Sequence, residues 1–151
     1  MQEKRVYMAA IFLCGIWMAG ILLAPLLASI GASAASDGLY GVYARTCHQI
    51  PSRSLFVFGR QMAVCSRCFG IYFGAFAGAV AAPALFLKKK ARPPGLRIVL
   101  VALLPLAIDG VTQLLGLRTS TNVLRLATGA VFGCVFTVYL LPLVAAREAR
   151  A

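Results

Sequence analysis

Apolar residues are gathered into four long runs along the chain, and shorter polar segments separate them. The runs cover residues 6–30, 69–87, 98–115 and 123–144. Each is close to the roughly 20 residues that a helix needs to cross the ~30 Å hydrocarbon core of a bilayer. The pattern predicts an all-α membrane protein, a bundle of four transmembrane helices that forms a single integral membrane domain over residues 1–151. The first run is longer than the apolar region of a signal peptide, so we expect it to be a retained span.

Residues 31–68 form the one long connection and join the first run to the second. The connection begins with the small residues of GASAASDG and later contains SLFVFGRQMAV, which is too apolar to lie in water. Adding that segment to the second run would make a span far longer than a bilayer requires. We therefore expect an interfacial or re-entrant loop that packs on the bundle like a lid, because backbone at membrane depth is tolerated only where protein covers it.

The composition of the chain excludes a soluble domain. Of its 151 residues, 61% are hydrophobic and only 13% are charged, whereas about a quarter of the residues in soluble domains are charged. We expect membrane lipids as partners and no nucleic acid, and the sequence leaves a homo-oligomer open. The small number of acidic and imidazole side chains, four Asp or Glu and one His, argues against a two-metal hydrolase, which needs many such ligands.

The basic residues orient the chain, since short cytoplasmic loops carry an excess of Lys and Arg. With both termini on one side, that side has nine basic residues and the other has six. We therefore expect a multi-pass protein of the cell (plasma) membrane with both termini cytoplasmic and the 31–68 loop outside. The nine are Lys4, Arg5, Lys88, Lys89, Lys90, Arg92, Arg97, Arg147 and Arg150, and the six are Arg45, Arg53, Arg60, Arg67, Arg118 and Arg125.

Three of the five cysteines and the one histidine gather in or beside this loop. Cys47 and His48 are adjacent in TCHQIPSRS, and Cys65 and Cys68 form the CxxC of CSRC. Three sulfurs and one imidazole nitrogen would complete a tetrahedral site, most simply for zinc. Neighbouring side chains reach one ion only at a turn, so His48 either joins the site or acts beside it as a general base or hydrogen-bond donor.

The same cysteines permit two other interpretations. Cys65 and Cys68 can form a redox-active pair with Cys47 as the exchanging partner, or the cysteines can form a purely structural disulfide or remain inert thiols. The arginine between the CxxC cysteines favours thiolate, which both a metal ligand and a nucleophile require. Cys14 and Cys134 lie within apolar runs, where a cysteine is usually a small apolar filler.

Asp109 is the one acidic residue inside an apolar run. An ionisable group at membrane depth indicates a functional site or a buried ion pair that joins two helices. Gln113 lies one helical turn later on the same face. We expect a polar pocket on the cysteine side, with Asp109, His48 and Arg125 as catalytic candidates if the protein is an enzyme. The candidates for binding an anionic or lipid-derived ligand are Gln113, Arg118, Asn122, Arg53 and Arg60.

Glycines at every fourth position of the second run indicate a close helix contact. These are Gly70, Gly74 and Gly78, and Gly129 with Gly133 offers a matching face on the fourth run.

The motifs CHQIPSRS, CSRCFGIYFG and DGVTQLLGLRTSTNVLR, with the TG that follows, resemble a family of small predicted membrane proteins called domain of unknown function 2085. The resemblance runs from about residue 43 to residue 133 and implies a four-helix membrane protein without an established activity. A looser likeness, at Cys65 and Cys68 only, is to quinone-linked disulfide-forming enzymes of bacterial membranes. It implies the alternative function, a quinone-linked thiol-disulfide oxidoreductase, although those enzymes have further cysteines in an outer region that this chain lacks. The sequence does not decide whether the protein is an enzyme.

Overall fold

The computed structural model describes residues 2–88 and 92–149, and it is mostly helical. Four of its helices are long and apolar enough to cross a membrane, which confirms the predicted bundle. A π-helical stretch, Pro83–Lys88, extends the second of them. The four helices are α1 (Gln2–Ser29), α3 (Ser66–Ala82), α4 (Leu96–Leu114) and α5 (Asn122–Glu148).

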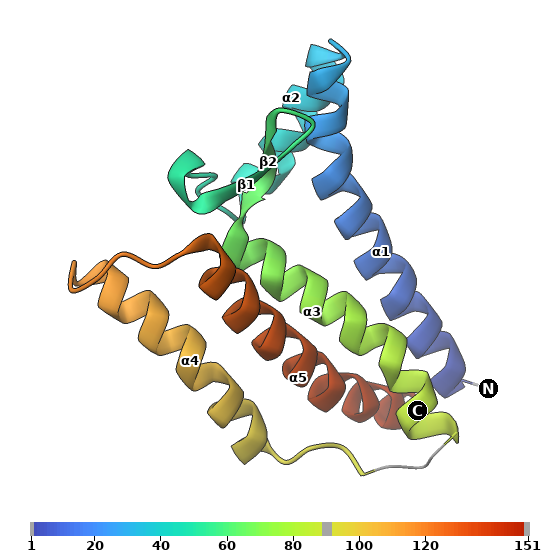
Figure 1. The fold of residues 1–151 in the computed structure, drawn as a ribbon. Coiled ribbons are helices and arrows are strands. Elements are labelled where there is room, and N and C mark those ends of the chain that lie inside the picture. Colours follow the sequence, from blue (N-terminus) through green and yellow to red (C-terminus); the bar gives the residue numbers. More distant parts are fainter. Residues whose placement is uncertain (1, 89–91, 150–151) are drawn as a thin grey trace.

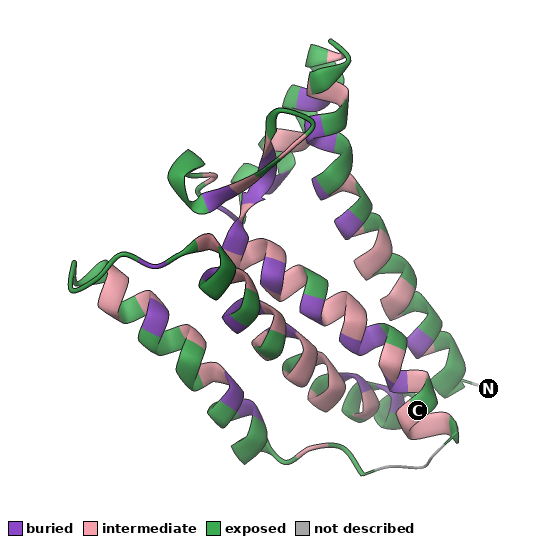
Figure 2. Ribbon diagram, viewed as in Figure 1, coloured by how far each residue is buried: buried purple, intermediate pink, exposed green. Residues whose placement is uncertain are grey.

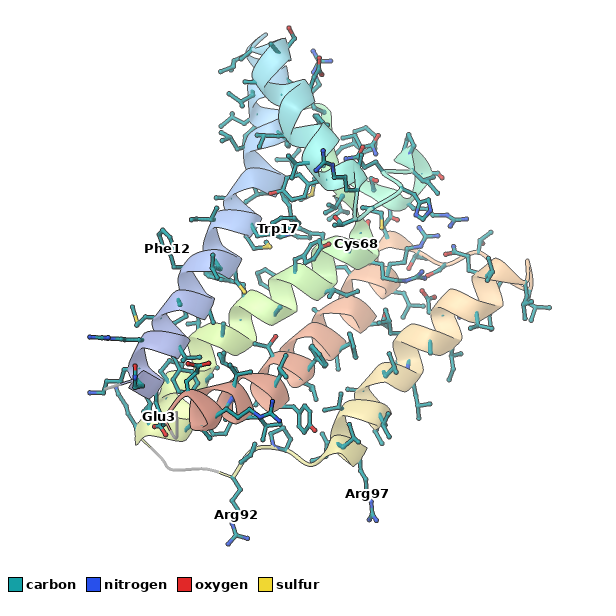
Figure 3. All side chains as sticks on the ribbon, turned by 180° about the vertical axis from the view of Figure 1, so that it is seen from behind. Glu3, Phe12, Trp17, Cys68, Arg92 and Arg97 are labelled. Atoms are coloured by element: carbon teal, nitrogen blue, oxygen red, sulfur yellow. The ribbon has the colours of Figure 1, made fainter. Side chains whose placement is uncertain are left out.

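The helices α3 and α5 lie side by side at the centre of the molecule (Figure 1). On one side α1 packs against α3, and on the other α4 lies beside α5. The start of α1 and the end of α5 lie at the same end of the molecule, and a small β-hairpin lies at the other, which we call the hairpin end. Figure 3 shows Arg92 and Arg97 far from Cys68, which lies at the hairpin end. Of the basic residues used for orientation, Lys89, Lys90 and Arg150 lie outside the described residues, and the cytoplasmic placement of the termini stays a prediction.

The α3–α5 contact is built on glycine, as the four-residue spacing predicted. A Cβ atom added to Gly78 would lie 2.8 Å from the carbonyl oxygen of Cys134, and one added to Gly129 would lie 2.5 Å from the carbonyl oxygen of Arg67. Gly70, Gly74 and Gly133 face backbone that is closer still. Figure 2 shows the resulting row of buried positions along α3, whereas α4 has few. Backbone-to-backbone packing therefore fixes the centre of the bundle.

We expect Gly74→Ala to lower the free energy of unfolding by about 1–3 kcal/mol, the usual cost of overpacking a tight contact. The added methyl group would overlap the backbone of Ala130, and neither helix can give way without losing its neighbours. Gly41→Ala is the matched control, because a Cβ atom there meets nothing within 4 Å and alanine favours the helix. Thermal unfolding in detergent would measure both variants, and equal stabilities would contradict this packing.

The connection between α1 and α3 is folded. After a turn at Gly31, whose φ of +81° suits glycine, a further helix, α2 (Ser33–Ala44), runs back along α1. The hydroxyl of Ser36 donates a hydrogen bond to the carbonyl oxygen of Ala24 at 2.9 Å, and that of Tyr43 donates to the carbonyl oxygen of Trp17 at 2.7 Å. The small residues of GASAASDG thus become part of a helix that α1 holds in place.

A short β-hairpin follows α2 and a 3-10 turn at Pro51–Arg53. Its strands are β1 (Ser54–Val57) and the antiparallel β2 (Arg60–Cys65). The two residues between them, Phe58 and Gly59, have φ values of +55° and +70°, the signs of the type I′ turn that suits a two-residue hairpin loop. Met62, Ala63 and Val64 of β2 are buried in a cluster with residues of α1. This contact covers part of SLFVFGRQMAV, whereas Phe56 and Phe58 remain exposed, and the depth of the hairpin in the membrane stays a prediction.

Candidate metal centre

The CxxC motif lies where β2 gives way to α3. Cys65 is the last residue of β2 and caps α3 with extended backbone angles, φ −69° and ψ 159°. Cys68 lies in the first turn of α3. Free N–H groups and the positive end of the helix dipole gather at such a terminus, and both favour a thiolate. The local fold therefore places the two cysteines where metal-binding and reactive cysteines are commonly found.

Cys47 reaches the same point from the end of α2. Its backbone N–H donates a hydrogen bond to the carbonyl oxygen of Tyr43 at 2.9 Å. Two residues later Gln49 adopts a φ of +50°, and its side-chain amide donates to the carbonyl oxygens of Tyr40 and Ala63 at 2.9 and 2.7 Å. These bonds tie the segment to both α2 and the hairpin, and they leave Cys47 only 6% exposed.

The three sulfur atoms of Cys47, Cys65 and Cys68 lie within 4.8 Å of one another. Zinc–sulfur bonds of about 2.3 Å place the sulfurs of a tetrahedral site about 3.8 Å apart, so a small adjustment would close this cluster around one ion. The backbone N–H of Cys65 donates to the Cys47 sulfur at 3.1 Å, a contact that stabilises negative charge on sulfur. Hydrogen bonds from Cys47 and then Cys68 hold the pKa of the Cys65 thiol well below its usual range. All five cysteines are free thiols.

His48 does not belong to this sulfur cluster. The side chain is exposed, but it lines the same cavity as the cysteines. The structure therefore brings His48 to the site without making it a ligand, and its role as ligand or base stays a prediction.

The cavity beside the cysteines has a volume of about 180 Å³. Besides the cysteines and His48, its polar lining includes Arg53, Arg67, Gln113 and Arg125. Of the eight polar residues that the sequence assigned to one pocket, four line this cavity: His48, Arg53, Gln113 and Arg125. Asp109, Arg118 and Asn122 lie outside its described lining. Arg60 is exposed on β2 and lies outside the described lining of the cavity.

Asp109 is 2% exposed and is held by two guanidinium groups. Arg67 of α3 donates to one carboxylate oxygen, and Arg118, beyond the end of α4, donates to the other at 2.5 Å. The Asp109 carboxylate is not part of the described lining of the cavity. The geometry is that of an ion pair that joins α3 to α4, and a catalytic role for Asp109 stays a prediction.

Asn122 and Arg125 occupy the first turn of α5, which Thr121 caps by accepting a hydrogen bond from the backbone N–H of Leu124 at 3.2 Å. Asn122 accepts a hydrogen bond from Arg125 at 2.7 Å and donates one to the carbonyl oxygen of Ser54 at 3.2 Å. Asn122 therefore ties α5 to β1 and at the same time orients the Arg125 guanidinium.

Sequence reasoning missed the central position of Arg67 at this site. It lies between the two CxxC cysteines, lines the cavity and pairs with Asp109. A signal was present, because an arginine in the first turn of an apolar helix needs a partner and the apolar runs contain a single acidic residue.

Comparison with known proteins agrees with this membrane architecture. A family model described as "Predicted membrane protein (DUF2085)" matches residues 47–139, a range that contains all three clustered cysteines. An uncharacterized protein of Methanocaldococcus jannaschii is 42% identical over a 147-residue alignment that covers 93% of each chain. An uncharacterized protein of Methanothermobacter thermautotrophicus is 46% identical over 83 residues, 55% of this chain and 73% of that one. No solved structure matches the chain.

Proposed function

The chain belongs to this family of predicted membrane proteins, and from that premise we propose that it binds one metal ion, zinc, through Cys47, Cys65 and Cys68. The observation that carries the proposal is the convergence of three free thiols from two distant segments within 4.8 Å. The other two cysteines lie in the membrane-spanning helices, outside the cluster. Thiolate sulfur is a preferred ligand of zinc, and the hydrogen bond from the Cys65 N–H supports charge on the Cys47 sulfur.

Three protein ligands would leave the fourth position of a tetrahedral ion open. The cavity adjoins all three cysteines, so that position would face the cavity. A molecule bound there would meet the metal on one side and the arginines on the other. The ion would also tie the end of α2 to the start of α3, and it would act as a Lewis acid on whatever group occupied the open position.

The side of the membrane on which the site lies follows from the basic residues. The positive-inside rule places the termini in the cytoplasm and the hairpin end outside. In an oxidising exterior, three neighbouring free thiols would be prone to form disulfides. A bound metal protects thiolates from oxidation to disulfides, which gives a second reason to prefer a metal centre in this position.

We expect protein purified without oxygen to contain about one equivalent of zinc per chain by elemental analysis. Cobalt substitution should give the visible absorption of a tetrahedral thiolate site, and chelation should increase the number of reactive thiols by three. A metal-free protein with a Cys65–Cys68 disulfide that quinone regenerates after reduction would overturn the proposal. That result would instead support a quinone-linked thiol-disulfide oxidoreductase.

A further inference from the structure

The cavity has more positive charge than its described surroundings neutralise. Arg53, Arg67 and Arg125 line it. Among the described residues, the one carboxylate paired with any of them is that of Asp109, which Arg67 shares with Arg118. Four guanidinium groups and one carboxylate give a net charge of +3. A zinc ion with three thiolates contributes −1, so a charge of about +2 would remain even with the metal bound.

Arg125 is the most deeply buried of these four arginines, at only 5% exposed. One of its terminal nitrogens donates to Asn122, but its Nε atom is buried and has no hydrogen-bond partner in the described part of the chain. Among residues 2–88 and 92–149, no carboxylate lies within ion-pair distance of it. The Nε atom of Arg67 is likewise buried without a partner. Burying an unpaired charge or hydrogen-bond donor lowers the stability of the fold unless a bound ligand pairs with it.

We propose that this cavity binds a phosphate group, held by Arg125 and Arg53 with support from Arg67 and Gln113. Guanidinium groups bind phosphate oxygens through paired, charge-assisted hydrogen bonds. The charge of a phosphate monoester near neutral pH, about −1.5 to −2, matches the surplus. A volume of about 180 Å³ equals about six water molecules at ~30 Å³ each, which is enough room for a phosphate group.

Two sources could supply this phosphate: inorganic phosphate in solution or the headgroup of a phospholipid. Both present anionic phosphate oxygens to the arginines, although a phospholipid diester has fewer free oxygens and less charge than inorganic phosphate. The site also adjoins membrane-spanning helices. The inference goes beyond the metal centre, because the guanidinium groups alone carry it.

Calorimetric titration tests the proposal with delipidated, zinc-loaded protein in a maltoside detergent that contains no phosphate. We expect inorganic phosphate to bind in one-to-one stoichiometry and Arg125→Gln to weaken binding at least tenfold. Arg53→Gln, at an exposed position that tolerates substitution, should weaken binding as well and covers the case in which Arg125→Gln does not fold. Arg60→Gln is the matched control, since it removes the same charge from the hairpin end outside the described lining of the cavity.

Short-chain phosphatidylglycerol, titrated in parallel, separates the two sources. Binding more than tenfold tighter than that of inorganic phosphate, with competition between them, would identify the headgroup as the ligand, and equal or weaker binding would identify free phosphate. Absence of binding by both probes, or equal weakening by Arg53→Gln and Arg60→Gln, would overturn the proposal. Elemental analysis of the same samples keeps the metal separate: metal-free protein that still binds phosphate would contradict only the zinc centre.

Discussion

Replacing Cys47 with serine is expected to abolish stoichiometric metal binding, the largest effect that we expect from a single substitution. Cys47 supplies one of three clustered sulfurs and accepts the hydrogen bond from the Cys65 backbone N–H. Loss of a group that merely orients a metal ligand typically costs about 10–100-fold in affinity, so loss of the ligand itself should cost at least about 100-fold. Competition with a chromophoric chelator would measure the affinity, and elemental analysis would measure the residual metal.

Three control variants make this result specific. Cys14→Ser and Cys134→Ser remove thiols from α1 and α5 outside the cluster, and both should keep one equivalent of metal. His48→Ala should also keep it, because the imidazole lies outside the sulfur cluster. If Cys47→Ser retained one equivalent with an unchanged cobalt spectrum, the metal could not be bound at this site. If His48→Ala lost the metal, the histidine would be the fourth ligand and the fourth position would be closed.

The membrane spans could be predicted because their signal is contained in the chain itself. An apolar run of about 20 residues has few other uses in a protein. The glycine spacing in α3 was equally direct, since every fourth residue of a helix falls on one face. The predicted apolar runs did not include the polar first and last turns of the helices. The α1 helix therefore begins before its run, at Gln2, and α5 ends after its run, at Glu148.

The fold of the long loop could not be predicted in the same way. The α2 helix contains small residues with little apolar pattern, and hydrogen bonds to the α1 backbone hold it in place. The hairpin turns at Phe58 with a positive φ, which is uncommon for a bulky residue and gives no recognised dipeptide signal. In both cases contacts distant in sequence determine the local structure.

In the candidate site, too, some features could be predicted from the sequence and others depend on contacts distant in sequence. The clustering of Cys47, Cys65 and Cys68 could be inferred from residue type and spacing, because a metal site and a redox relay both require the three thiols to lie close together. That His48 lies outside the sulfur cluster depends on the fold of its loop, and no local sequence pattern indicates it. Asp109 has two partners, one of them on another helix, and only packing selects Arg67 and Arg118 from the six arginines assigned to that side.

Replacing Asp109 with asparagine should lower the free energy of unfolding by about 3 kcal/mol. The carboxylate is buried and accepts hydrogen bonds from Arg67 and Arg118. Breaking a buried ion pair costs about 3–5 kcal/mol because the remaining charge stays buried without a partner. The lower value applies here because the Arg118 side chain is 45% exposed and water screens its charge. Denaturant or thermal unfolding in detergent would measure the loss.

Asp37→Asn provides the matched control. Asp37 is exposed on α2 and belongs to neither of the ion pairs found in the described part of the chain, so the same substitution there should change stability by less than about 0.5 kcal/mol. A double replacement, Asp109→Leu with Arg67→Met, should recover much of the loss, because removing both partners leaves no buried charge unpaired. If Asp109→Asn were instead as stable as the unmodified protein, the carboxylate would not hold α3 to α4. Its burial between two arginines would then need another explanation, such as the catalytic role that the sequence analysis predicted for Asp109 alongside His48.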